Sequence, residues 1–348
     1  MLEVIGAGVG NTAGQTTDFV DIFNKSAKKA VMDEMLSRDG MTRPAPGSSA
    51  LAFTNKRAAS SATQASFVIG RFFNVYWRTA SYNLTRFGIA LFLSILFGIT
   101  YADADYVTYS GINSGIGMVF MTSMLLTMVS FQGVIPMVGD ERPSFYRERA
   151  SQTYNAIWYF LGVFLAEIPY VFGSSFIFVA ILFPSVGFRT AHDFFIYWLV
   201  VALFVLLMTY AGIFLAFAMP SVEIAMIIGI VFVSIFVLLM GYNPPASAIP
   251  KAYKWVYQIT PHRYALEALV ATVFGNCDGS DMSRVACKVL ENAPPTVKDG
   301  TTIAELVDTT FAMKYANLWR DVGVLAGIAV VFAFFALLSI RYVNHQKR

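Results

Sequence analysis

Residues 194–222 read FFIYWLVVALFVLLMTYAGIFLAFAMPSV and contain no charged side chain. A helix needs about 20 apolar residues to cross a bilayer core of about 30 Å, so this run is long enough to span a membrane. Membrane β-strands need only about ten residues of alternating polarity, and this run is much longer. The stretch therefore predicts a transmembrane helix and, with it, an all-α integral membrane protein.

Further charge-free runs follow along the chain. From their positions we expect six transmembrane helices, at roughly 84–102, 115–136, 155–183, 194–219, 222–241 and 321–341. The composition agrees, because the 348 residues are 56% hydrophobic and only 14% charged, whereas an average soluble domain has about 25% charged residues. So few charges exclude an intrinsically disordered chain, and a net charge of +3 gives no support for nucleic acid binding.

The distribution of Lys and Arg orients the six spans. Basic residues gather before the first span, in the 137–154 loop and in the tail, whereas the 103–114 loop has none. Basic loops of this size stay in the cytosol, so we expect both termini to be cytosolic and the loop at about 242–320 to be external. Within that loop, the 246–275 stretch has helical spacing and is expected to form re-entrant helices that dip into the outer leaflet.

The residues before the first span are more polar than the rest. Residues 1–63 are expected to form a cytosolic linker with one short helix near 17–37. Residues 64–82 are expected to form an amphipathic connecting helix, since apolar side chains from Val68 to Tyr76 fall at helical spacing. Such a helix can lie along the inner membrane surface. The alternative is a cytosolic continuation of the first span.

The sequence offers no catalytic or metal-binding pattern. It contains no G-x-x-x-x-G-K-[ST] motif, so no P-loop for a nucleotide is predicted in this chain. His192, His262 and His345 are scattered, and two cysteines are too few for a four-cysteine zinc site. We therefore expect no bound cofactor, no metal ion and no enzymatic activity from this chain alone.

A charged and aromatic segment lies between the second and third spans. Residues 139–156 read GDERPSFYRERASQTYNA and place acidic and basic side chains around Phe145 and Tyr146. A short cytosolic loop of this kind can dock a partner through charge pairs and an aromatic anchor. The alternative is a solvated turn whose basic residues serve only as anchors on the cytosolic side.

Several motifs in a fixed order resemble the membrane domain of subfamily G ABC transporters, an ABC-2 type domain. They are E-R-x-x-F-Y-R-E at 141–148 followed by Tyr154, A-E-I-P-Y at 166–170, G-Y-N-P-P at 241–245 and YQITPHRYALEAL at 257–269. The opening M-L-E-V-I and the later D-F-V-D-I-F-x-x-S resemble the linker after the second ATP-binding domain of full-size pleiotropic-drug-resistance transporters. The resemblance covers nearly the whole chain, and residues 83–348 would be the transmembrane domain.

The resemblance implies the membrane-spanning half of an ATP-driven ABC exporter, with a pathway for amphipathic or lipid-like small molecules and efflux of xenobiotics. ATP and Mg²⁺ would be bound by a nucleotide-binding domain outside these residues, in the same polypeptide or as a separate partner. A second ABC membrane domain, the lipid bilayer and a hydrophobic substrate are the other expected partners, and the plasma membrane is the expected location. Two other classes stay open: a non-transporting scaffold or regulator, and an ATP-independent channel or carrier.

The resemblance also implies roles for individual residues. Coupling to the ATPase through a cytosolic coupling helix would rest on Glu141, Arg142, Phe145, Tyr146, Arg147 and Glu148. Substrate would pass between the second and fifth spans, where the candidate contacts are Phe120, Met121, Met124, Leu125, Met128, Val233, Ser234 and Val237. Methionine offers an adaptable apolar surface for unlike ligands, although any single one of these residues can equally be ordinary packing. Tyr242 and Asn243 would form an extracellular plug.

Glu167 interrupts the third span. An ionisable side chain inside a membrane is unfavourable by a few kcal/mol and is functional by default. We expect a structural or coupling role more than proton or substrate chemistry. Arg86, Tyr154 and Gln152 are the candidate partners.

Cys277 and Cys287 both fall in the predicted external loop. The outside of a cell is oxidising, so a disulfide between them is expected. Free thiols and intermolecular bonds are the alternatives.

Overall fold

The computed structural model describes residues 19–38, 47, 57, 59–246, 248–277, 284–295 and 297–345. Much of the predicted 1–63 linker lies outside the described residues. The chain divides into two units, residues 1–56 and 57–348. In the first unit, α1 (Phe19–Asn24) and α2 (Ala27–Ser37) take the place of the one short helix predicted near 17–37. The Ser26 side chain caps α2 by accepting a hydrogen bond from the Lys29 backbone N–H.

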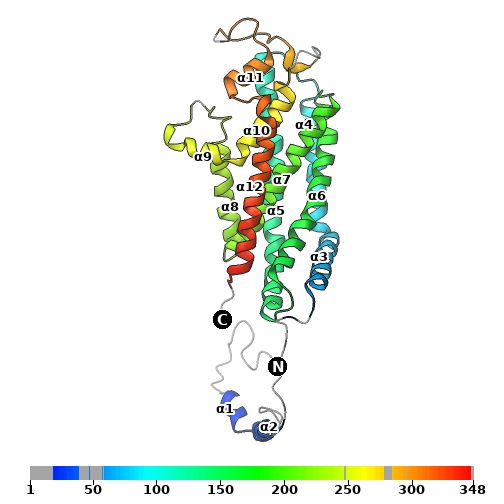
Figure 1. Cartoon of the computed structure of the whole chain (residues 1–348), viewed down its shortest axis with the longest axis vertical. Helices are drawn as coiled ribbons and strands as arrows, with labels where there is room; N and C mark the ends of the chain where they lie inside the picture. Colours follow the sequence, from blue (N-terminus) through cyan, green and yellow to red (C-terminus); the bar gives the residue numbers. More distant parts are fainter. Residues whose placement is uncertain are drawn as a thin grey trace, which may run out of the picture. The chain divides into compact units, whose positions relative to one another are not determined.

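All six predicted spans fall on helices of the second unit (Figure 1). These helices are α4 (Ala80–Thr100), α5 (Tyr109–Ala150), α6 (Ala156–Ser185), α7 (Ala191–Ala218), α8 (Val222–Leu238) and α12 (Leu318–Tyr342). Five of them are long and apolar enough to cross a membrane, and the chain is an all-α integral membrane protein. α8 has 17 residues and measures about 26 Å at about 1.5 Å per residue, so it is the short member of the set.

The second span is much longer than predicted. α5 runs without a break through 42 residues, or about 63 Å, which is about twice the thickness of the bilayer core. The 137–154 loop expected after this span is therefore wrong, because residues 137–150 continue the same helix, and the predicted coupling residues from Glu141 to Glu148 lie on this continuation. This part of α5, called the α5 extension below, stays helical through Pro143 because Phe145 and Tyr146 beyond it are buried.

α7 is the central helix of the second unit. It packs against α5, α6, α12 and α10 (Pro261–Val270), and most of its length is buried. Gly212 lets α7 approach α5 closely, since a Cβ atom there would lie 2.9 Å from the Phe131 carbonyl oxygen. α4 runs along α6 on the outside of this centre (Figure 1).

The amphipathic helix predicted before the first span is α3 (Ser61–Arg78). Val68, Phe72 and Tyr76 lie on its buried face and pack against α6, whereas Trp77 is 79% exposed. Thr79 separates α3 from α4, so α3 is a helix of its own rather than a continuation of the first span.

The predicted external loop is folded into short helices gathered at one end of the second unit (Figure 1). In chain order they are η1 (Lys251–Tyr253), α9 (Lys254–Ile259), α10, the π-helical η2 (Ala271–Gly275), η3 (Val285–Cys287), α11 (Ile303–Phe311) and η4 (Tyr315–Asn317). α10 is almost entirely buried against α7 and α12. Cys277 and Cys287 are joined in a disulfide, with their Cα atoms 5.1 Å apart.

Candidate functional site

An apolar groove opens between α5 and α8. Its volume is 570 Å³, which lies within the range of about 300–1,000 Å³ that is typical of sites for small organic molecules. It is lined by Phe120, Met121, Met124, Met128, Ile230, Val233, Ser234, Val237, Leu238, Met240, Tyr242 and Asn243. Met121 is 50% exposed although it is a large apolar side chain. Ser234 donates its hydroxyl hydrogen to the Ile230 carbonyl at 2.7 Å, so the groove presents mainly apolar surface.

The predicted pathway residues meet in this groove, with one exception. Leu125 lies outside it, while the other predicted residues of α5 and α8 line it. The reason is the helical turn of about 100° per residue. Along α5 the lining side chains occupy the arc from Phe120 to Met121, and Leu125 points about 40° beyond Met121.

Tyr242 and Asn243 lie at the end of the groove where α8 stops. The Tyr242 ring lies 5.1 Å from the Phe120 ring, and its hydroxyl donates to the Asn113 carbonyl at 3.5 Å. Gly241, with φ of +91°, turns the chain after α8 in a conformation that favours glycine. The two residues expected to form a plug thus border the groove beside α5.

Glu167 lies at the centre of a buried ionic cluster. Its carboxylate accepts hydrogen bonds from Arg86 Nη1 at 2.8 Å and from the hydroxyls of Tyr76 and Tyr82, each at 2.8 Å. Arg86 is 3% exposed and Glu167 is 0% exposed. Because Tyr76 comes from α3, Tyr82 and Arg86 from α4 and Glu167 from α6, this cluster joins three helices.

The structure selects Arg86 from the partners considered for Glu167. Tyr154 and Gln152 bond elsewhere, to Glu148 and to the Arg149 carbonyl respectively. Sequence reasoning missed the two tyrosines. Tyr82 and Arg86 are four residues apart and share a helix face, with the guanidinium carbon 4.7 Å from the ring centre, so this spacing was the available signal for Tyr82. Tyr76 lies on the preceding helix and carried no such signal.

A second ionic cluster lies at the end of the α5 extension. Arg71 of α3 donates from Nη1 to Glu148 Oε1 at 2.6 Å, and the Tyr154 hydroxyl donates to the other Glu148 oxygen. Partial burial would raise the pKa of the Glu148 carboxyl, but the hydrogen bonds from Arg71 and Tyr154 and the Arg71 charge together hold that pKa below its usual value. Glu148 therefore fastens α5 to α3.

Two arginines of the α5 extension bind the carboxyl ends of other helices. Arg142 donates to the carbonyls of Ala216, Met219 and Pro220, each at 2.7 Å, at the end of α7. Arg149 donates to the Ile340 and Arg341 carbonyls near the end of α12. The last carbonyls of a helix lack partners within it, so cations are favourable there.

The other predicted coupling residues differ in exposure. Phe145 and Tyr146 are buried, and the Phe145 ring lies 4.2 Å from the Tyr159 ring and 6.0 Å from the Phe217 ring. They are core residues in this conformation and present no aromatic anchor to a partner. Arg147 is exposed and makes one hydrogen bond, to the Ser144 hydroxyl at 3.3 Å, while Glu141 is partly exposed.

The family assignment follows from the comparison of this chain with known proteins. The family model described as ABC-2 type transporter matches residues 63–274, which include most of α3, all of α4 to α8 and both ionic clusters. The chain belongs to the ABC-2 type transporter family. The groove, Glu167 and the α5 extension are therefore features of an ABC-2 membrane domain.

Curated relatives of this ABC-2 domain are subfamily G transporters of rice. ABC transporter G family member 38 of Oryza sativa subsp. japonica is 30% identical over 338 residues, covering 95% of this chain and 21% of that protein. Member 36 of Oryza sativa subsp. indica is 30% identical over 351 residues, covering 100% of this chain and 23% of that protein. These relatives confirm the predicted resemblance to subfamily G. The chain spans less than a quarter of the length of the curated relatives it matches.

Within the described residues of this ABC-2 domain, no group of three or more histidine, cysteine, aspartate or glutamate side chains is placed to hold a metal ion. The side chains of the groove and of the ionic clusters offer hydrogen bonding, ion pairing and apolar contact. The groove can hold an apolar molecule, and the ionic clusters can fix helices relative to one another.

Proposed function

We propose that this chain is the membrane-spanning half of an ATP-driven exporter, and that the groove between α5 and α8 lines its pathway for amphipathic or lipid-like small molecules. The observation that carries this proposal is the groove itself. Its lining brings Met121, Met124 and Met128 opposite Val233 and Val237 on an open face of the bundle. A second membrane domain placed against this face would enclose the groove.

ATP and Mg²⁺ would be bound by a nucleotide-binding domain that is not among these residues, in the same polypeptide or in trans. Arg147 and Glu141 of the α5 extension are the predicted coupling residues with side chains open to such a domain. Movement of the extension would reach α7 and α12 through the carbonyl contacts of Arg142 and Arg149. The same movement would reach α3 through the contact of Glu148 with Arg71. From α3 it would reach the buried Glu167 cluster through Tyr76.

The proposed orientation places the α5 extension and both termini in the cytosol, with the plasma membrane as the location. Three arginines lie together at this end of the bundle. Arg71 contacts the end of α5, Arg142 the end of α7 and Arg149 the end of α12. This concentration of basic residues at one end of the bundle is typical of the cytosolic side. Residues 242–320, which contain the disulfide, would then be external, and Tyr242 and Asn243 would act there as the plug.

The test uses groove-filling substitutions in a reconstituted transporter that contains this chain, a second membrane domain and nucleotide-binding domains. Met121→Trp and Val233→Trp each place a large side chain in the groove, and we expect both to reduce ATP-dependent uptake of fluorescent amphipathic dyes into inside-out vesicles. Leu125→Trp is the matched control, since Leu125 is an exposed α5 residue outside the groove. Equal loss in all three variants, or no loss in any, would count against the groove as the pathway.

Two further measurements separate the alternatives. Arg147→Glu should reduce transport while membrane insertion and thermal stability stay nearly unchanged, because the exposed Arg147 side chain makes one hydrogen bond within the described residues. The purified chain without ATPase domains should give no flux in liposomes. ATP-independent flux would identify a channel or carrier, and a correctly folded complex without any transport would favour a scaffold or regulator.

A further inference from the structure

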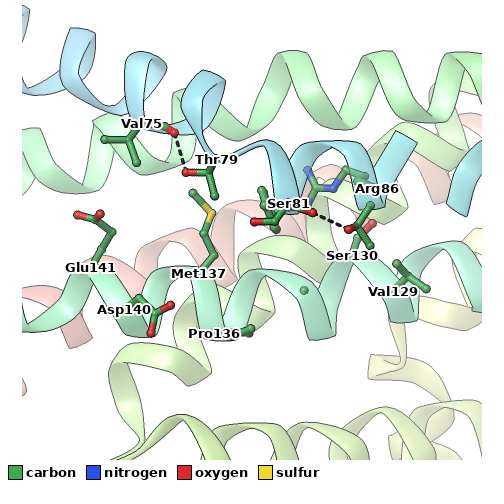
Figure 2. Close-up of a pocket in the computed structure, with 13 residues that line it drawn as sticks. Val75, Thr79, Ser81, Arg86, Val129, Ser130, Pro136, Met137, Asp140 and Glu141 are labelled. Carbon is green, nitrogen blue, oxygen red and sulfur yellow. Dashed lines mark hydrogen bonds between the residues drawn. The ribbon is translucent and has the colours of Figure 1, made fainter. Parts of the chain in front are cut away.

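A second cavity lies between α3, α4 and α5, away from the groove. It has a volume of 440 Å³ and is bordered by α3 and α4 on one side and by the α5 residues from Val129 to Glu141 on the other. Figure 2 shows Arg86 beside Ser130 at one end of this cavity and Asp140 and Glu141 at the other. Ser130 and Asp140 are ten positions apart on α5, so the cavity extends over about 15 Å.

The end with Asp140 and Glu141 is negatively charged. Neither carboxylate has a hydrogen-bond or ion-pair partner within the part of the chain that the structure describes, and the Asp140 side chain is exposed. Arg86 is the cation that borders the cavity, but Glu167 neutralises it at 2.8 Å. The mouth of the cavity therefore attracts a positive charge.

Four of the five hydroxyl groups that border the cavity, all except that of Ser81, donate their hydrogens within the protein. Thr79 donates to the Val75 carbonyl at 2.8 Å, as Figure 2 shows, and Ser130 donates to the Leu126 carbonyl at 3.1 Å. Thr85 likewise donates to Ser81, and Tyr82 to Glu167. These oxygens keep lone pairs for a ligand but have no hydrogen left to give. A ligand whose polar end carries hydrogen-bond donors fits these acceptors, and the negative charges of Asp140 and Glu141 disfavour a carboxylate or phosphate.

The rest of the cavity wall is mainly apolar. Val75, Val129 and Met137 provide the apolar surface. At the deep end Arg86 is 3% exposed, and its Nε has no hydrogen-bond partner within the described residues. Because this atom is itself buried, it is not open to a ligand in the cavity.

We propose that this cavity is a binding site for a single-chain amphipathic amine. Its ammonium group lies between Asp140 and Glu141, and its apolar chain runs along α5 past Met137 toward Val129. The site is separate from the groove between α5 and α8, since the two cavities share no lining residue. It opens at the end of the bundle that carries the α5 extension, so the ligand enters from that side.

The test is photolabelling of this chain in phosphatidylcholine nanodiscs with a dodecylamine that carries a diazirine on its chain. We expect labelled residues on α4 and α5 around Gly133, and competition by dodecylamine but not by dodecanol or dodecanoate at equal concentration in the membrane. Equal competition by dodecanol, or labels confined to the groove around Met121, would overturn the proposal.

Variants address the charge and the volume separately. Asp140→Asn with Glu141→Gln should weaken the apparent affinity by about fivefold or more, the scale for two partly exposed ion pairs. Glu223→Gln is the control, because Glu223 is an exposed carboxylate at the start of α8 and lines neither cavity. Gly133→Leu should reduce labelling by filling the cavity, since a Cβ at Gly133 already lies 3.7 Å from the Tyr82 ring. Full labelling in both test variants would refute the site, and the comparison of competitors on the unmodified chain stays decisive if a variant fails to fold.

Discussion

The buried pair of Arg86 and Glu167 gives the sharpest quantitative prediction, a double-substitution cycle. Arg86→Met leaves Glu167 fully buried with two tyrosine donors but no positive charge. Removing one partner of a buried ion pair destabilises a protein by about 3–5 kcal/mol, because the remaining charge is uncompensated. Glu167→Gln should destabilise by a similar amount, since it leaves Arg86 charged at 3% exposure.

The double variant Arg86→Met with Glu167→Gln buries no charge. The amide oxygen that the Glu167→Gln substitution introduces would still accept hydrogen bonds from the tyrosines, so we expect a loss of only about 1–2 kcal/mol from the missing guanidinium contacts. The two single effects together should therefore exceed the double effect by about 3 kcal/mol or more. Such a coupling would show that Arg86 and Glu167 stabilise the contact between α4 and α6 as a pair.

The assay is unfolding of the purified chain in mixed micelles with increasing SDS, followed by tryptophan fluorescence; Trp158 and Trp198 lie on α6 and α7. Asp308→Asn is the control, because Asp308 pairs with Lys314 at 3.2 Å on an exposed surface and should change stability by no more than about 1 kcal/mol. Additive single effects, or a loss below about 1 kcal/mol for Arg86→Met, would refute the reasoning.

Three further predictions concern the α5 extension and the disulfide between Cys277 and Cys287. Arg142→Ala should destabilise the chain by about 2–3 kcal/mol because three carbonyls lose a charged donor, whereas Arg147→Ala should stay within about 0.5 kcal/mol in the same SDS titration. The pKa of Glu148 is lowered in the folded chain, so its contribution to stability is present above the usual carboxyl pKa of about 4.3 and is lost as the pH falls through the lowered value. Thermal unfolding between about pH 6 and pH 3 should therefore show a smaller decline for Glu148→Gln than for the unmodified chain, and equal declines would contradict this. Replacing both Cys277 and Cys287 by serine opens a loop with a sequence separation of 10 and should lower stability by about 3 kcal/mol, with a reductant having the same effect on the unmodified chain and none on the variant.

The sequence was sufficient to locate the helices that cross the membrane. For five of the six spans, the ends predicted from charge-free runs lie within a few residues of the helix ends in the structure, and α5 is the exception. The end of α5 was missed because the charged residues after 137 cannot lie inside a membrane, so they were assigned to a loop and not to a helix that continues beyond it. In the structure Arg142 and Arg149 bond to helix ends and Phe145 is buried, so contacts from α7 and α12 keep this segment helical.

The candidate site was partly within reach of the sequence. Family resemblance named the α5 and α8 residues that line the groove, but only the rotation of α5 separates Leu125 from its neighbours. Glu167 was recognisable as an unfavourable charge in an apolar run. Arg86 was one of its three candidate partners, but the sequence could not choose among them, because Arg86 is 81 residues away in the chain and periodicity carries no information about contacts at that distance.

The sequence by itself determined that this chain spans a membrane, where its helices run and which family it resembles, because all three follow from local composition and short motifs. Tertiary structure alone decided which charges are paired. Arg86 meets Glu167 and Arg71 meets Glu148 only when α3, α4, α5 and α6 pack together. The same packing leaves Asp140 and Glu141 beside an open cavity. The physical reason is that the charge of a side chain is fixed by its chemistry, whereas its partners are fixed by the neighbours that folding brings to it.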